Sequence, residues 1–136
     1  MKKEAVQFEE KIKKFLENLG FNDVDGGRDD FLINGIRVDV CGGREDVLLV
    51  MKFKSAEEIE RKNLRHFVNI FREKIPLLKR GLSEHPTYKK YNYHKYVIVT
   101  RNIEIVREDI LFAKQDPRIY LWDGNLIDCL HDTICE

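Results

Sequence analysis

The sequence contains few cysteines and prolines, no long apolar run and no net charge. Three cysteines are an odd number and too few for a disulfide framework, which favours a reducing, cytoplasmic location. The apolar runs span only a few residues, so we expect no membrane-spanning helix and no membrane partner. The N-terminal residues do not resemble a secretory signal.

Hydrophobic residues nevertheless make up 43% of the 136 residues, which excludes a disordered chain. The length suits one hydrophobic core. No repeat, linker or low-complexity tract divides the sequence. We therefore expect residues 1–136 to form a single domain.

The zero net charge conceals an uneven distribution. Residues 1–51 carry 8 basic and 11 acidic side chains (net −3), residues 52–101 carry 13 and 5 (net +8), and residues 102–136 carry 3 and 8 (net −5). A balanced total argues against a nucleic-acid-binding protein. A polyanion, however, responds to local clusters of charge, and the central segment is strongly basic.

Hydrophobic periodicity predicts an alternation of strands and helices. The sequence predicts a helix over 4–19 ended by Gly20, a hairpin over 31–40 with an Asn34-Gly35 turn, a turn over 42–46 and a strand over 47–54. It then predicts a helix over 56–75 that Pro76 ends or kinks, a loop over 83–95, a strand over 96–100, a helix over 103–115, a strand over 119–122 and a helix over 126–134. This order predicts an α/β fold with a mixed five-stranded sheet flanked by helices.

Charged residues follow apolar residues at the end of the strand over 47–54. Lys52 and Lys54 are two residues apart and so share one face of that strand. If this strand pairs with the hairpin arm at 36–40, Asp39 faces both lysines. A strand whose end turns from apolar to charged indicates a functional site.

These motifs resemble the signature of the PD-(D/E)xK nucleases, in their Mrr-like branch. Asp39 on one strand is followed by a turn and by an apolar strand that ends in Lys52-Phe53-Lys54. The run Phe8-Glu9 looks like the first helix of that branch, and the segments 97–100 and 119–126 look like its last strands. The resemblance implies a restriction-endonuclease-like three-layer fold, and a DNA endonuclease that uses Mg²⁺ to hydrolyse phosphodiesters.

Position by position, the resemblance assigns three residues. Asp39 matches the metal-binding aspartate, Glu9 the glutamate that some members add to the metal site, and Lys54 the lysine that assists the attacking water. Lys52 stands where the family has its second acid. Two unit charges ~4 Å apart interact by about 4 kcal/mol at an effective dielectric near 20, so a charged Lys52 opposes a divalent cation.

Three explanations for Lys52 remain open. The chain is a natural pseudo-nuclease that binds without cutting, or another acid replaces the missing one, or the sequence is an inactivated variant of an active parent. The candidate replacement acids are Glu45, Asp46, Glu57 and Glu58. The plainer alternatives are that Asp39 is an ordinary strand residue, that the two lysines are edge charges, and that Glu9 is a solvated helix residue.

The basic central segment predicts a nucleic-acid partner, DNA in the first place. The candidate contacts are Lys52, Arg61, Lys62, Arg65, Lys89, Lys90, Tyr91 and Lys95. Interleaved tyrosines and lysines suit phosphate contacts and stacking on unpaired bases. They also suit an oligomer interface, and the helical cations also suit the wet face of an amphipathic helix.

Two functions follow as hypotheses. The first is a DNA-binding nuclease-fold protein, with metal-dependent cleavage if its site is competent. The alternative is a catalytically inactive interaction or assembly subunit that pairs with an active nuclease or with itself as a homodimer. We expect no zinc site, because Cys129-x-His131-x₃-Cys135 has no standard zinc-ligand spacing.

Overall fold

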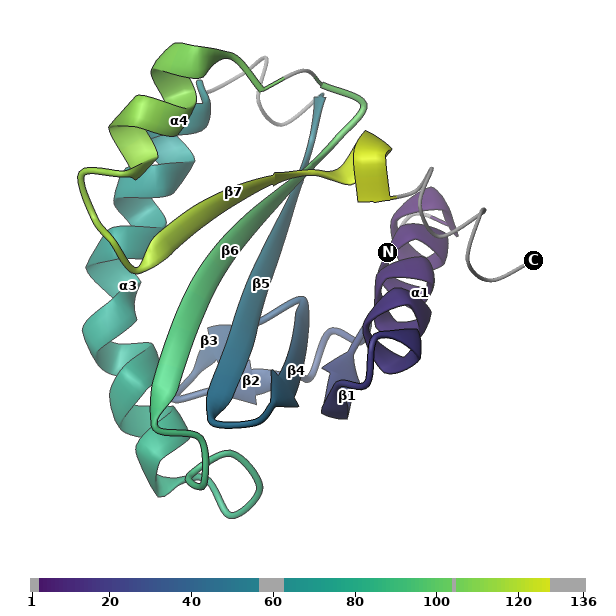
Figure 1. The fold of residues 1–136 in the computed structure, drawn as a ribbon, viewed down its shortest axis with the longest axis vertical. Coiled ribbons are helices and arrows are strands. Elements are labelled where there is room, and N and C mark those ends of the chain that lie inside the picture. Colours follow the sequence, from purple (N-terminus) through teal and green to yellow (C-terminus); the bar gives the residue numbers. More distant parts are fainter. Residues whose placement is uncertain (1–2, 57–62, 104, 128–136) are drawn as a thin grey trace.

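The computed structural model describes residues 3–56, 63–103 and 105–127 of the chain (Figure 1). The helices are α1 (Lys3–Asn18), α3 (Leu64–Glu84) and α4 (Arg107–Ala113). The strands are β1 (Asn22–Gly26), β2 (Leu32–Ile33), β3 (Ile36–Arg37), β4 (Val40–Arg44), β5 (Val47–Ser55), β6 (Tyr93–Arg101) and β7 (Ile119–Asp123). None of the described helices is long and apolar enough to cross a membrane.

Five of the strands form one mixed sheet, in the order β1-β4-β5-β6-β7. The β1–β4 and β4–β5 pairs are antiparallel, and the β5–β6 and β6–β7 pairs are parallel. Helix α1 lies on one face of the sheet, and α3 and α4 lie on the other (Figure 1). The predicted α/β class, with a five-stranded mixed sheet flanked by helices, is therefore confirmed.

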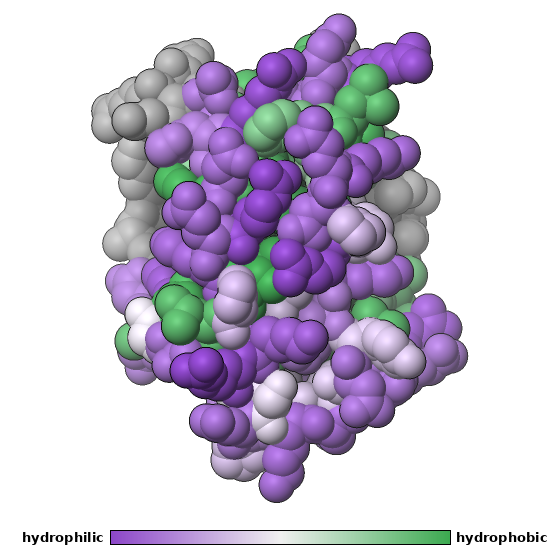
Figure 2. Space-filling model, turned by 90° about the vertical axis from the view of Figure 1, so that its left-hand side faces the viewer, coloured by the Kyte–Doolittle hydropathy of each residue, from purple (hydrophilic) through white to green (hydrophobic). Residues whose placement is uncertain are grey.

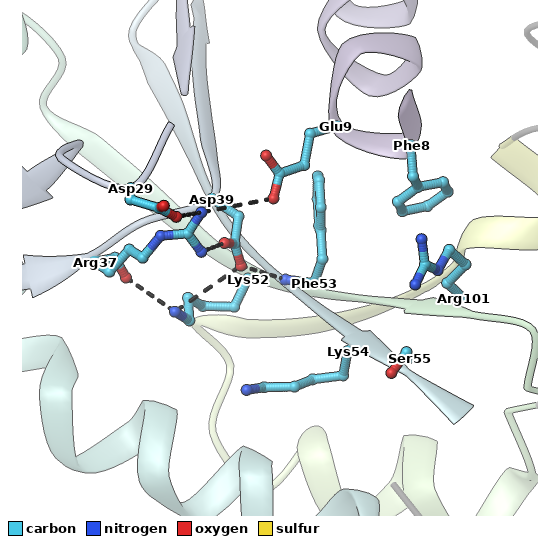
Figure 3. Close-up of a pocket in the computed structure, with 10 residues that line it drawn as sticks. All are labelled: Phe8, Glu9, Asp29, Arg37, Asp39, Lys52, Phe53, Lys54, Ser55 and Arg101. Carbon is cyan, nitrogen blue, oxygen red and sulfur yellow. Dashed lines mark hydrogen bonds and ion pairs between the residues drawn. The ribbon is translucent and has the colours of Figure 1, made fainter. Parts of the chain in front are cut away.

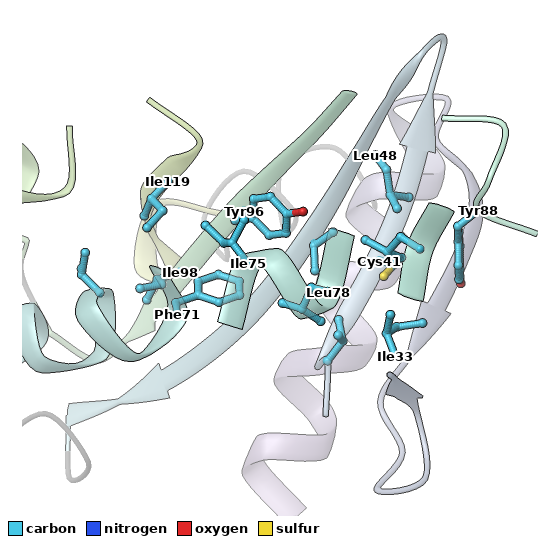
Figure 4. Packing of buried hydrophobic residues seen from close by; sticks show 14 of the residues in the cluster. Ile33, Cys41, Leu48, Phe71, Ile75, Leu78, Tyr88, Tyr96, Ile98 and Ile119 are labelled. Atoms are coloured by element: carbon cyan, nitrogen blue, oxygen red, sulfur yellow. The ribbon is translucent and has the colours of Figure 1, made fainter. Parts of the chain in front are cut away.

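The two faces of β5 bury separate apolar clusters. Leu49 and Met51 pack with the α1 side, whereas Leu48 and Val50 pack with the α3 side. On the α3 side, the Phe71 ring meets Tyr96 edge-on at 5.8 Å between centroids (Figure 4). The alternation predicted for this strand is confirmed, and Lys52 and Lys54 continue the α3 face.

The predicted hairpin over 31–40 is only half right. Its turn is confirmed, because Asn34 and Gly35 have the positive φ values of 51° and 76° that such a turn requires. The second arm, however, ends at Arg37, and β2 and β3 form a sheet of their own. The chain then joins the main sheet at Val40, so the arm does not run on to that residue as predicted.

Strand β4 also corrects the turn predicted over 42–46. Gly42, Gly43 and Arg44 belong to β4 and pair with β5, so the connection shrinks to Glu45 and Asp46. The other edge of β4 pairs with β1, a strand that was not predicted from the sequence. The β1 sequence Asn-Asp-Val-Asp-Gly has weak strand propensity, and its place in the sheet comes from pairing with β4.

Helix α3 passes Pro76 and continues to Glu84, so the helix does not end at Pro76, which was one of the two predicted effects of that residue. Pro76 faces solvent, while Ile75, Leu78 and Leu82 extend the buried stripe of the helix. Burial of that stripe outweighs the hydrogen bond that proline removes. Most of the helix predicted over 126–134, and residues 57–62, lie outside the described residues, although 124–127 are helical.

Candidate functional site

Asp39 lies where β4 separates from β5. Its N–H donates to the Met51 carbonyl at 3.0 Å, and its Oδ2 accepts from the Phe53 N–H at 2.7 Å. The backbone carbonyl of Asp39 accepts a hydrogen bond from the Gly27 N–H at 2.9 Å. This carbonyl leaves no room for a side chain at Gly26 (φ 127°), because a Cβ there would lie 2.1 Å from the Asp39 carbonyl oxygen. The Asp39 side chain is 4% exposed and is thus firmly held.

Arg37 connects the acidic groups of the site (Figure 3). Its Nη1 donates to Asp39 Oδ1 in a close ion pair. Its Nη2 lies 3.8 Å from Glu9 Oε1 and 3.5 Å from Asp29 Oδ1. Three carboxyl groups from α1, from the segment before β2 and from the segment before β4 therefore surround one guanidinium.

Glu9 reaches the site from α1, as its predicted role requires. Its side chain is buried, and Oε2 has no hydrogen-bond partner among the described residues. Burial, followed by the repulsion of Asp39, raises the pKa of Glu9 from 4.5 to about 7, although Arg37 opposes the shift. Glu9 therefore carries a proton over part of the neutral range.

Lys52 extends from β5 toward Asp39. Its Nζ donates to the Arg37 carbonyl at 3.0 Å and lies 3.9 Å from Asp39 Oδ2. Burial lowers the pKa of Lys52, Asp39 opposes that shift, and the nearby Lys54 adds to it. The predicted approach of Asp39 and Lys52 is present in the structure.

These residues line a cavity of about 320 Å³. Among the described residues, its lining includes four cationic side chains (Arg37, Lys52, Lys54 and Arg101) and three acidic ones (Glu9, Asp29 and Asp39). With Glu9 protonated, the cations exceed the carboxylates by two. The Arg101 guanidinium lies 5.8 Å from the Phe8 ring centroid, at the same end of β5 and β6. The cavity is therefore better suited to an anion than to a cation.

The residues of this cavity do not fit a Mg²⁺ ion as they are arranged. Magnesium needs carboxylate oxygens with room for water, but Arg37 takes Asp39 Oδ1, and Lys52 and the Phe53 N–H face Oδ2. Glu45 and Asp46 form the turn at the far end of β5 and cannot replace the missing acid. Glu57 and Glu58 lie outside the described residues. Over 3–56, 63–103 and 105–127, no three metal-ligating side chains cluster.

The loop before β6 lies at the opposite end of β5 from Lys52, because Val47 pairs with Tyr93. Tyr91 is 6% exposed and packs over Gly43, and its hydroxyl donates to Asp23 at 2.6 Å. Its ring is thus buried and not available for stacking on a base, contrary to the predicted role. Lys90 pairs with Asp23 at 2.8 Å, whereas Lys89 is exposed.

Lys95 and Arg65, two further predicted nucleic-acid contacts, do not line the cavity either. Lys95 lies over the Tyr120 ring at 5.3 Å. Arg65 lies 3.6 Å from Asp109 of α4. Arg61 and Lys62 fall outside the described residues. The outer surface on the α3 side is mostly hydrophilic with separate apolar patches, as an amphipathic helix requires (Figure 2).

Sequence reasoning missed Arg37, Asp29 and Arg101 as residues of the site. Arg37 had a signal, because it is two residues from Asp39, and residues two apart share one face of an extended strand. The other two reach the cavity only through the fold and have no local pattern.

Comparison of the chain with protein-family models, with curated proteins and with solved structures found no match. The function of this site therefore has to be argued from its own geometry and from the sequence motifs.

Proposed function

We propose that this chain is a restriction-endonuclease-like domain of the PD-(D/E)xK class that binds DNA, with a site adapted to hold a backbone phosphate in place of a metal ion. The order of elements supports the class. Helix α1 brings Glu9 to Asp39, Asp39 lies where β4 leaves β5, and β5 ends in Lys52 and Lys54.

The observation that carries the proposal is the contact of Arg37 and Lys52 with Asp39. In a metal-dependent nuclease a divalent cation neutralises the phosphate. Here the side chains of Arg37 and Lys52 lie beside the Asp39 carboxylate, and Lys52 Nζ is 3.9 Å from Asp39 Oδ2. Lys54 and Arg101 add positive charge beside them. Arginine and lysine are also the usual donors to DNA phosphates.

DNA binding is tested by fluorescence anisotropy with a labelled duplex. We expect affinity to fall steeply as salt rises, because phosphate contacts release counterions. Lys54→Ala is expected to weaken binding several-fold. Lys114→Ala, an equal charge change at the exposed end of α4, serves as the control and is expected to leave binding nearly unchanged. Salt-independent binding would refute the proposal.

Cleavage is tested with plasmid DNA and Mg²⁺ or Mn²⁺. We expect no cleavage by the natural chain, because Lys52 and Arg37 already neutralise Asp39. Lys52→Glu restores the family's acid and removes one cation. Cleavage by this variant alone would support the proposal that the site derives from a nuclease site in which Lys52 replaced the metal-binding acid. Lys52→Gln is the control that removes charge without supplying a ligand. Metal-dependent cleavage by the natural chain would contradict the adapted site.

One observation favours the alternative of an inactive assembly subunit. Ile110 and Leu111, adjacent residues of α4, are 38% and 53% exposed. Exposed apolar side chains that lie near one another are typical of protein interfaces. A stable dimer in sedimentation analysis, together with no retention of DNA, would favour this function over the first.

A further inference from the structure

A second cavity of about 180 Å³ lies on the α3 side of β5. Its walls are apolar and come mainly from α3, with Phe67, Ile70 and Phe71 as members. Its charged members are Lys52, Lys54 and Lys74, and none of the residues described over 3–56, 63–103 and 105–127 adds an acidic side chain to its lining. The two lysines of β5 therefore line both this cavity and the one beside Asp39.

The charge of this cavity favours an anion. Burial lowers the pKa of Lys52 most and Asp39 opposes that shift, while Lys54 and Lys74 add to it, so each of these two ammonium groups repels that of Lys52. In Figure 3 Lys54 extends away from Glu9, while Lys52 is joined to Arg37 and Asp39, and both lysines also line this cavity. An anionic group held between them relieves this repulsion.

The remainder of the cavity favours a flat apolar group. Lys54 Nζ lies 4.5 Å from the centroid of the Phe67 ring, so a cation and an aromatic side chain are adjacent. The volume is smaller than the roughly 300–1,000 Å³ typical of pockets for whole drug-sized molecules. The space therefore suits one part of a larger ligand, such as a single nucleobase.

We infer that this cavity receives an unpaired nucleobase, while Lys52 and Lys54 hold the phosphate of the same nucleotide. The inference rests on the proposed DNA-binding function and deepens it. It assigns the substrate class as DNA with an unstacked nucleotide, since a base inside a duplex cannot enter a pocket. Phe67 and Ile70 supply the contact surface for the base.

The test compares two single strands of equal length and charge, one of thymidines and one with an abasic analogue at every position. We expect the natural chain to bind the thymidine strand about fivefold tighter or more, because base–aromatic contact supplies a gain of that size. Phe67→Leu keeps an apolar side chain but removes the ring, and it is expected to bring the ratio below about twofold. Leu77→Ala, on the exposed side of the same helix, is expected to keep the ratio.

Lys74→Ala provides a second variant that disturbs no packing, because Lys74 is exposed. It is expected to weaken binding of both strands alike. Equal affinity for the two strands in the natural chain, or an unchanged ratio in Phe67→Leu, would overturn the inference. If the inference fails in this way but the chain still binds duplex DNA in a salt-dependent manner, the proposed DNA-binding function stands. If the chain binds neither single-stranded nor duplex DNA, both the inference and the proposed function are refuted.

Discussion

Glu9 couples the stability of the fold to pH. Its carboxyl takes up a proton more readily in the folded chain, where its pKa is about 7, than in the unfolded chain, where it is 4.5. The folded state therefore binds more protons between these values. The contribution of this group to stability is fully present below pH 4.5 and is lost as the pH rises through 7. The loss amounts to as much as about 3 kcal/mol, at roughly 1.4 kcal/mol for each pKa unit.

The measurement is urea denaturation of the natural chain and of Glu9→Gln at pH 5 and pH 8. The amide of the variant is neutral at both pH values, and all other titrating groups are shared. We expect the free energy of unfolding of the natural chain to decrease relative to the variant between the two pH values. Parallel pH dependence of the two proteins would show that Glu9 is not perturbed.

The individual residues of the site were partly predictable from the sequence. Asp39, Lys52 and Glu9 were predicted from the resemblance to a nuclease motif, and all three line the same cavity. Arg37 was not predicted as a site residue, although its guanidinium lies beside all three carboxyl groups. Local spacing gives the direction of a side chain, but the choice among several partners depends on the whole fold.

At the scale of elements, β4 depends on its adjacent glycines. A Cβ on Gly43 would lie 2.1 Å from Tyr91 Cζ, so the buried ring would have to move. We expect Gly43→Ala to reduce the free energy of unfolding by about 1–3 kcal/mol, the usual cost of overpacking. A Cβ on Gly42 would meet the flexible Leu16 and Val24 side chains at 3.3 Å. Gly42→Ala is therefore the matched control, expected to cost less, and equal losses in denaturant titrations would contradict this packing.

Pro76 is the weak position of α3. It lies on the exposed side of the helix interior, where proline costs a hydrogen bond and clashes with the preceding turn. We expect Pro76→Ala to raise the free energy of unfolding by about 1–2 kcal/mol, since part of the gain is offset by greater freedom of the unfolded chain. The neighbouring Leu77→Ala should change stability little. A lower midpoint of thermal unfolding for Pro76→Ala would show that the proline is needed for the helix path.

Hydrophobic periodicity predicted the elements that bury an apolar stripe. The elements with low strand propensity were not predicted. Strand β5 and helix α1 follow their patterns almost residue for residue. Strand β1 is polar, and the glycines of β4 are typical of a turn, so neither had a local signal. Both are strands because they pair with each other and because β4 pairs with β5, a long-range effect that local sequence does not contain.

At the scale of the whole molecule, the excess of +8 in residues 52–101 does not form one surface. The cavity with Lys52 and Lys54 lies at one end of β5, and Lys89 lies near the other end, where Val47 pairs with Tyr93. Lys52 follows Val47 by five positions along the strand, or about 17 Å at 3.3 Å per residue. The sequence shows that this segment is basic, but only the strand topology shows that its cations lie at both ends of β5.

Under the proposed DNA-binding function, this division predicts which lysines contact the phosphates. The logarithm of affinity falls with the logarithm of salt concentration by about 0.9 for each phosphate contact. Lys54→Ala should therefore reduce the slope by about one, because it removes a contact at the cavity. Lys89→Ala removes the same charge at the far end of the sheet, and it should leave the slope unchanged. Anisotropy titrations over a range of salt concentrations measure both slopes. A reduced slope for Lys89→Ala alone would place DNA at the loop before β6 and leave the cavity beside Asp39 without a role in binding.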